Sequence, residues 1–416
     1  MRRKDRNFRT VKESEDGTEK LIDRLVEEIN TEDMTIQDLE QQIRRHKIRF
    51  WQRVGAGVAV TLALAIGIYL LIALQTYSKA RVLKTYSDGE IANSSYAYFN
   101  SGILKYSRDG AAYLNQQGEE KWNQSYQISN PVVEQNKKAA VIADKGGNDI
   151  WVVEKDGVKG EIHTTMPIEK VAVSQQGIVG AILRDDMAAK ILCYDMEGNV
   201  LVEMKTSPAN TGYPMDLSIS ENGETVQVLY LTTQEGKIAS EIVYYNFGKN
   251  GNEKKEYVVS REHYENVVMA EGAFLDRTNS VGIHDKGFVI YRGESQPKET
   301  EKVTIKKKIK SAFFNDRYIG LILQNEKKGG CELRLYNTAG KKVLSKNFKG
   351  EYSQVQIHDS QVILYEGKKC CIFSKSGVKK FEGELSSSIQ EMFPISGVNK
   401  YIVINTDGIQ EVRLVK

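Results

Sequence analysis

Side chains that could bind a metal or act as nucleophiles are scattered through the sequence without the spacing of a known site. The candidate zinc-ligating histidines are His163, His263, His284 and His358. They form no HxxxH or HExxH pair, the spacing that places two imidazoles on one helix face. Asp144, Asp185 and Asp186 lie beside turns but lack the alternating oxygen ligands of a calcium loop. We therefore expect no catalytic residue, cofactor or metal, with a zinc site assembled from distant strands as an alternative.

One dense basic run stands out in an otherwise balanced chain. It consists of Lys302, Lys306, Lys307, Lys308 and Lys310. Such a run could bind a polyanion, such as lipid headgroups or wall polymers, or it could be a solvated strand edge that discourages pairing. The whole chain has 58 Lys and Arg against 55 Asp and Glu, so it lacks the single-sign charge of a nucleic-acid-binding protein.

An uncharged apolar stretch, 54–74, divides the chain. It is long enough for a helix that crosses a bilayer, and it is longer than the apolar core of a cleaved signal peptide. The membrane-spanning residues predicted from this stretch include Val54, Leu62, Leu64, Ile66, Leu70 and Leu74. We interpret 54–76 as a signal anchor that is not cleaved, with residues 1–53 as a cytoplasmic tail and 77–416 as an extracytoplasmic domain.

Flanking charges set the predicted orientation. Basic residues near a membrane helix stay on the cytoplasmic side. Five of them precede the stretch and three follow it: Arg44, Arg45, Lys47, Arg49 and Arg53, then Lys79, Arg81 and Lys84. The bias predicts a cytoplasmic N-terminus. The tail itself shows helical periodicity over about 18–30 and 36–50, which predicts two short amphipathic helices. They could bind a cytoplasmic partner, form a short coiled coil, or lie on the membrane surface.

Beyond residue 77 the apolar pattern changes to a period of two, and we find no helical pattern longer than a turn or two. Apolar runs of strand length recur between turns rich in Gly, Asn, Asp and Ser. The clearest are 139–144, 150–155, 190–195, 227–233, 241–247, 318–325, 332–337, 361–367 and 400–406. The pattern predicts an all-β domain.

These strands are organised by a repeat. A polar residue is followed three positions later by Gly and four positions after that by an apolar residue. The clear instances are Asn115–Gly118–Trp122, Asp195–Gly198–Val202, Asn337–Gly340–Leu344 and Ser374–Gly377–Phe381; weaker copies centre on Gly157, Gly251, Gly293 and Gly408. We expect the polar side chain to bond the turn backbone, the Gly to adopt positive φ, and the apolar residue to pack the outer strand onto its own blade.

The spacing of the repeat indicates a β-propeller. Successive marker glycines lie 31 to 53 residues apart, close to the length of a four-stranded blade. Eight markers predict about eight blades, with seven as the alternative. The last repeat is one strand short, and the segment 82–91 could supply that strand and close the ring, removing an exposed edge.

The unit NQQGEEKW at 115–122 resembles the repeat of quinoprotein-like and WD40-like propellers and their outer-membrane-assembly relatives. The whole arrangement resembles a family of membrane-anchored propellers of unknown function from Gram-positive bacteria. No catalytic residues are assigned in that family, so the resemblance transfers no site residue to this sequence. Some quinoprotein enzymes carry an adjacent-cysteine disulfide, which Cys370 and Cys371 could imitate. Strand alternation instead predicts one thiol inside the blade and one outside, as small hydrophobic side chains, with a bridge to Cys193 or Cys331 as a further alternative.

We therefore predict a single-pass membrane protein whose propeller is a non-catalytic binding or scaffold module for a protein or polymer of the cell envelope. A sensory variant and a purely structural propeller remain open. The alternative from another class is a membrane-tethered lyase or hydrolase that acts on cell-wall glycan. It requires carboxylates, His or Arg that converge in the central channel with perturbed pKa values, whereas a channel mouth lined by Ser, Asn and Lys favours binding.

Overall fold

The computed structural model describes residues 36–86, 93–185, 189–204, 206, 211–234, 236–325, 329–359, 361–397 and 399–416. The chain divides into two compact units, Met1–Gln75 and Thr76–Lys416. Each is described separately.

The described part of the first unit is one continuous helix, α2 (Ile36–Leu74). It contains the stretch Ile43–Leu71, which is long and apolar enough to cross a membrane. Thr61 is a polar residue in this stretch, and its Oγ1 donates to the carbonyl oxygens of Gly57 (3.1 Å) and Val58 (2.9 Å), so the hydroxyl is satisfied within the helix. The helix expected over 36–50 is the beginning of α2, and the one expected over 18–30 lies outside the described residues.

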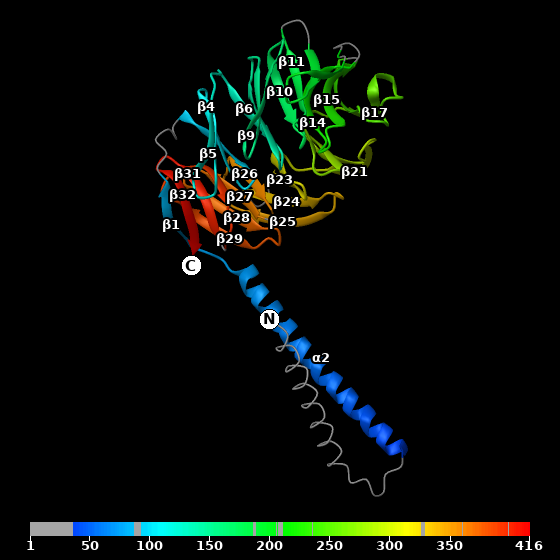
Figure 1. The fold of residues 1–416 in the computed structure, drawn as a ribbon, viewed down its shortest axis with the longest axis vertical. Coiled ribbons are helices and arrows are strands. Elements are labelled where there is room, and N and C mark those ends of the chain that lie inside the picture. Colours follow the sequence, from blue (N-terminus) through cyan, green and yellow to red (C-terminus); the bar gives the residue numbers. More distant parts are fainter. Residues whose placement is uncertain are drawn as a thin grey trace, which may run out of the picture. The chain divides into compact units, whose positions relative to one another are not determined.

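The second unit is an eight-bladed β-propeller, as the repeat predicted (Figure 1). Each blade is a four-stranded antiparallel sheet. Blades 1 to 4 comprise β2 (Ser95–Phe99), β3 (Gly102–Tyr106), β4 (Gly110–Leu114) and β5 (Glu120–Ser125); β6 (Pro131–Gln135), β7 (Ala139–Asp144), β8 (Asp149–Glu154) and β9 (Gly157–His163); β10 (Ile168–Val173), β11 (Val179–Arg184), β12 (Ala189–Tyr194) and β13 (Val200–Met204); β14 (Tyr213–Ile219), β15 (Thr225–Gln234), β16 (Lys237–Asn246) and β17 (Val258–Glu265), with the short 3₁₀ helix η2 (Lys255–Tyr257) before β17.

Blades 5 to 8 repeat this order, except that the last blade takes its outer strand from the start of the propeller. They comprise β18 (Met269–Phe274), β19 (Asn279–His284), β20 (Gly287–Arg292) and β21 (Lys298–Thr304); β22 (Ile309–Phe314), β23 (Tyr318–Gln324), β24 (Cys331–Asn337) and β25 (Lys342–Phe348); β26 (Gln354–His358), β27 (Gln361–Glu366), β28 (Lys369–Ser374) and β29 (Lys379–Glu384); β30 (Ile389–Pro394), β31 (Lys400–Asn405), β32 (Gly408–Val415) and β1 (Lys79–Tyr86). We number the strands of a blade first to fourth in this order.

The expected ring closure is confirmed. Strand β1 pairs antiparallel with β32, from Lys79 opposite Val415 to Tyr86 opposite Ile409. The strand begins three residues before the segment predicted for this role, and residues 87–91 of that segment lie outside the described residues. Because β1 and β32 are hydrogen-bonded, the two ends of the propeller chain form one sheet, and the ring has no open edge there.

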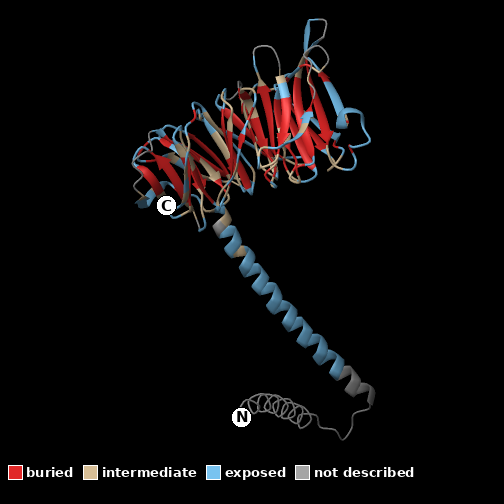
Figure 2. Ribbon diagram, turned by 45° about the horizontal axis from the view of Figure 1, so that its top comes forward, coloured by how far each residue is buried: buried red, intermediate tan, exposed pale blue. Residues whose placement is uncertain are grey.

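The core lies between the blades (Figure 2). Each of the eight interfaces between neighbouring blades holds one cluster of buried apolar side chains. The second strand β7, for example, is buried at every position. A neighbouring blade covers each face of a sheet, so both sets of alternating side chains are apolar in the second and third strands.

The adjacent cysteines correct one expectation. Cys370 and Cys371 are both fully buried, in the clusters facing blade 8 and blade 6 respectively. Neither thiol is on the outside, because both faces of the third strand β28 are covered. All four cysteines are free thiols, so the chain contains no disulfide bridge.

The four clear marker turns connect the third and fourth strands of their blades. At the first turn, Asn115 Oδ1 accepts hydrogen bonds from the backbone amides of Gln117 and Glu119, both 2.9 Å. Gly118 has φ +70°, and Gly198, Gly340 and Gly377 have similar values. Trp122 then stacks on Tyr113 of its own blade, with ring centroids 6.3 Å apart. It also donates from Nε1 to the carbonyl oxygen of Lys155 in blade 2 (3.1 Å).

One weak marker occupies a different turn. Gly408 lies between the second and third strands of blade 8, whereas Gly157, Gly251 and Gly293 lie between third and fourth strands. The last blade has no third-to-fourth turn, because its fourth strand comes from the other end of the propeller. The count of eight markers therefore equals the number of blades even though Gly408 marks a turn between second and third strands.

Candidate functional site

The mouth of the central channel is a cavity with a volume of about 600 Å³. All eight blades contribute to it through the ends of their first strands and the turns that follow. Besides His358 at the end of β26, the strand residues at the mouth are Tyr98, Gln135, Val173, Ile219, Phe274, Phe314, Ile357 and Pro394. Seven of these eight side chains are apolar or aromatic, so they form an apolar collar around the opening.

Several polar residues at the mouth are committed to their own turns. Asn136 Oδ1 accepts from the backbone amides of Lys138 and Ala139, and its Nδ2 donates to Val173 O (2.8 Å). Asn315 and Ser174 bond the amides of their turns in the same way. These side chains satisfy backbone groups as Asx- and ST-turns do. The ionic side chains are therefore the principal groups left to contact a ligand.

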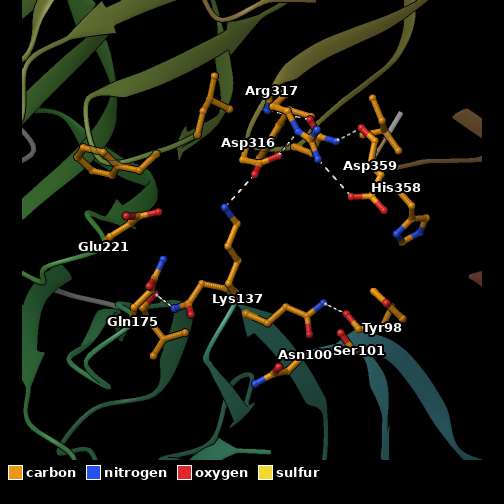
Figure 3. A pocket seen from close by; sticks show the side chains of 18 of the residues that line it. Tyr98, Asn100, Ser101, Lys137, Gln175, Glu221, Asp316, Arg317, His358 and Asp359 are labelled. Carbon is orange, nitrogen blue, oxygen red and sulfur yellow. Dashed lines mark hydrogen bonds and ion pairs between the residues drawn. The ribbon is translucent and has the colours of Figure 1, made fainter. Parts of the chain in front are cut away.

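An ion pair spans the mouth from blade 2 to blade 6, which stand opposite each other in an eight-membered ring. Lys137 Nζ lies 2.8 Å from Asp316 Oδ2 (Figure 3). Asp316 Oδ1 is 3.5 Å from Arg317 Nε, and Arg317 Nη2 is 3.2 Å from Asp359 Oδ1 in blade 7. The four side chains form a row of alternating charge across the opening.

Both members of the cross-channel pair are held in their charged forms. The hydrogen bond to Asp316 raises the pKa of Lys137. Burial alone would raise the pKa of Asp316, but the hydrogen bond and charge of Lys137 outweigh it, and the pKa of Asp316 is lowered. The pair nevertheless stays partly open to solvent, with the Lys137 side chain 64% exposed and Asp316 30% exposed.

His358 lines the mouth as a neutral aromatic group. Its ring contacts Tyr98 edge-on at 5.5 Å and Phe393 at 5.8 Å, and its Nε2 lies 2.9 Å from Gln356 Oε1. Burial lowers the pKa of His358 to about 4. The imidazole is therefore uncharged near neutral pH.

Deeper in the channel, the first strands carry ionisable residues at equivalent positions. In five blades a β-bulge near the start of the first strand is followed by a polar residue: Lys170, Asp216, Glu271, Ser311 and Glu391. Each lies three positions before the strand residue at the mouth, about 10 Å deeper at about 3.3 Å per residue. A bulge redirects the side chain beside it, so this position is built similarly around the ring.

We call Glu134, Asp216, Glu271 and Glu391 the channel carboxylates. Burial raises the pKa of each of them, and for Glu134 to about 7. The charge of Asp216 adds to the effect at Glu134 and Glu271, and Lys170 opposes it. Asp216 accepts a hydrogen bond from Gly272 N (2.8 Å) and lies 3.4 Å from Lys170 Nζ.

The sequence reasoning did not find these residues. Four of the bulged strands share a three-residue pattern in which an apolar residue is followed two positions later by a polar one. The four instances are Ile168–Lys170, Met269–Glu271, Ile309–Ser311 and Ile389–Glu391. Taken alone, such a triplet resembles an ordinary strand that is half exposed. It becomes informative only when aligned across blades.

Apart from His358 at the mouth, the residues singled out in the sequence lie away from the channel or are structural. Asp144 is buried and accepts from the amides of Ser129 (3.1 Å) and Asn130 (2.8 Å). Asp186 lies outside the described residues. His163 pairs with Asp149 and His263 with Glu241. Within the described ranges no group of three His, Cys, Asp or Glu side chains is arranged to hold a metal ion.

The basic run lies in and after β21, at the face opposite the mouth, where the chain passes from blade 5 to blade 6. Lys302 lies over the ring of Tyr264 at 5.0 Å. Lys307 pairs with Glu332 at 2.6 Å, and Lys310 with Glu351 at 3.6 Å. Lys306 and Lys308 are exposed. Three of the five lysine side chains thus contact other side chains of the protein. The run therefore offers less unpaired positive charge to a polyanion than the sequence suggested.

The mouth and the entry of the chain share one face of the propeller. First and third strands run toward the mouth, so the turns between third and fourth strands, including the four clear marker turns, surround it at the outer rim. The chain enters at the same face, where the amide of Tyr77 donates to Lys380 O (2.8 Å) and that of Ser78 to Val415 O (3.0 Å).

Residues 73–414 match the model of a family described as a family of unknown function (DUF5711). No curated protein is detectably similar in sequence. Among solved structures, the fold is similar to BamB from Moraxella catarrhalis, with a TM-score of 0.50, 10% identity, and coverage of 80% of this chain and 99% of that one. It is also similar to Sqt1 from Saccharomyces cerevisiae, with a TM-score of 0.51, 10% identity, and coverage of 82% and 99%. At this identity the likeness concerns the fold alone.

Proposed function

The chain belongs to the DUF5711 family of unknown function, and we propose that it is a membrane-anchored binding or scaffold module of the cell envelope. In this proposal α2 is an uncleaved anchor with a cytoplasmic N-terminus. The excess of basic residues before the apolar stretch supports that orientation. The propeller would bind an envelope protein or polymer, and the N-terminal tail would contact a cytoplasmic partner.

The observation that carries the proposal is the channel mouth. It is a cavity built by all eight blades, and it has an apolar collar. Across it runs a row of four charged side chains that pair with one another instead of bonding the backbone of a turn. A cavity with an apolar lining and a few directed polar groups is the usual form of a binding site. Both solved propellers above share the fold, which is compatible with a binding role but does not assign one.

The experiment is crosslinking in intact cells, followed by purification in detergent and mass spectrometry of what remains attached. The full chain is compared with a chain lacking residues 1–43 and with the double variant Lys137→Ala/Asp316→Ala. We expect an envelope partner that survives the truncation and is lost in the double variant. The matched control is Lys306→Ala/Lys308→Ala on the opposite face, which should keep the partner. A partner lost with the tail but retained in the double variant would contradict recognition at the mouth.

A second candidate, an enzyme acting on wall glycan, is favoured by one observation. The channel carboxylates converge with raised pKa values, and a carboxyl group that titrates near pH 7 suits general acid catalysis. The mouth itself, with Asn100, Ser101 and Lys137, favours binding. Turnover of purified glycan by the wild-type chain, abolished in Glu134→Gln or Glu391→Gln, would establish the enzyme and replace the binding proposal.

A further inference from the structure

We infer that the mouth of the channel binds its ligand through an alkylammonium group, and that Lys137 occupies the place of this group in the free protein. The inference rests on the proposed function, in which the mouth is the recognition site. The ligand chemistry is an apolar stem that ends in a positively charged nitrogen. A lysine side chain of a partner polypeptide and a small polyamine both carry it.

The first argument is the position of Lys137. Its ammonium group reaches from the turn after β6 across the opening to Asp316 in blade 6, 2.8 Å away (Figure 3). An amine of the chain itself is thus already seated in the mouth. Exposed ion pairs of this kind contribute little to stability, so an incoming ammonium group can displace Lys137 at little cost.

The second argument is the sign of the charge around that position. At the mouth three carboxylates, Glu221, Asp316 and Asp359, face two cations, Lys137 and Arg317. Below them lie the four channel carboxylates, and Lys170 is the cation that acts on three of them among the described residues. The acids outnumber the bases at both levels. A cationic group is attracted into the channel, and an anionic one is repelled.

The third argument is the apolar collar. Val173, Ile219, Phe274, Phe314 and Ile357 line the opening between the charged rim and the channel carboxylates. Lysine and polyamine chains cover apolar surface with their methylene groups and keep the charged head in polar surroundings. The order of rim, collar and channel therefore matches an alkylammonium group better than a compact inorganic cation.

The test is a pair of variants with opposite expected effects. Binding of a pentalysine peptide to the full chain in detergent is measured by calorimetry. Lys137→Ala removes the internal competitor, so we expect it to tighten binding by up to about fivefold. Asp316→Asn removes the acceptor, so we expect it to weaken binding. Lys306→Ala on the opposite face should change nothing, and unchanged thermal unfolding of each variant shows that the fold is intact.

Two further probes identify the ligand chemistry. Acetylated pentalysine keeps the stem but loses the charge, and it should not bind. Spermine tests the small-molecule source: binding as tight as that of pentalysine assigns a polyamine, and binding of the peptide alone assigns a polypeptide. Binding of pentaglutamate, weakened by Lys137→Ala and tightened by Asp316→Asn, would overturn the inference. Equal effects of both variants on pentalysine binding would also overturn it, because the pair would then be only structural.

The inference and the proposed function fail separately. If the mouth variant Lys137→Ala/Asp316→Ala loses the crosslinked partner in cells but no amine probe binds, the scaffold role stands and the alkylammonium assignment falls. If pentalysine binds with the expected pattern and no partner is captured, the assignment stands without the scaffold.

Discussion

Glu134 illustrates how the channel alters a single residue. Its side chain is accessible to solvent, yet it lies on a first strand and is enclosed by the channel walls. Burial is the main reason why its pKa rises to about 7, with a further contribution from the negative charge of Asp216. Near neutral pH the carboxyl group is therefore half protonated, and its charge in the folded state has a free-energy cost.

This predicts a pH-dependent effect of Glu134→Gln. The folded-state pKa is above the ordinary value of 4.5, so between these two values the folded protein binds more protons than the unfolded chain. The free energy of unfolding therefore falls as pH rises through that window. At pH 8 we expect Glu134→Gln to stabilise the protein by about 1 kcal/mol, after allowance for solvent screening, and at pH 4 to have no effect.

Thermal unfolding at the two pH values measures this effect. Glu161→Gln is the control, because Glu161 is an exposed carboxylate on β9 of the same blade, and it should leave Tm unchanged at both. A Tm of Glu134→Gln that does not differ from wild type at pH 8 would show that the channel does not disfavour the charged form.

At the scale of elements, the marker turns combine a side-chain bond with a backbone conformation that favours glycine. Gly118 and Gly198 have φ +70° and +86°. A methyl group on Gly198 would meet its nearest neighbour at 3.6 Å, an ordinary contact, whereas one on Gly118 would lie 2.9 Å from the ring of Tyr86 in β1. The turn of blade 1 thus packs tightly against the strand that closes the ring.

The two glycines therefore form a matched pair. Both alanine variants adopt a left-handed conformation that costs about 1–2 kcal/mol. Gly118→Ala should destabilise the propeller further, because Tyr86 must move. Denaturant unfolding of the two variants compares them directly. Equal losses would mean that Tyr86 adapts without cost, and that the turn does not support the closing strand.

The elements also show what local sequence can predict. All nine apolar runs singled out in the sequence are second or third strands, such as β7 and β8, because these strands are covered on both faces. First and fourth strands are polar at many positions, and apart from the closing strand β1 none of them was predicted from an apolar run. The first strands build the channel, so the candidate site consists of the strands with the weakest local signal. The side chains that meet across the channel come from blades far apart in the sequence, so local sequence does not predict these contacts.

At the scale of the whole molecule, ring closure depends on one pair of strands. Arg81 of β1 lies directly opposite Arg413 of β32. Opposed residues in an antiparallel pair have Cα atoms about 4.5–5.5 Å apart, within the range that a disulfide spans. The four native thiols are buried, so they should not compete for oxidation.

We predict that Arg81→Cys/Arg413→Cys forms a disulfide under mild oxidation, seen as a mobility shift on a non-reducing gel. The bond would close a loop that contains most of the propeller and should stabilise it by about 4 kcal/mol. The control is Arg81→Cys/Glu411→Cys, because Glu411 pairs with Lys84 and is displaced diagonally from Arg81. Equal crosslinking in the control would contradict the observed register.

The closure by β1 and β32 also imposes an order on biosynthesis. Blades 1 to 7 are each made of four consecutive strands, so each can form soon after the ribosome has produced it. Strand β1 is synthesised before all of them, yet its partner is synthesised after them. Throughout that interval β1 has an edge without its partner, of the kind that pairs with foreign strands. The newly made chain therefore carries an unpaired edge in its oldest propeller strand until the final blade is translated.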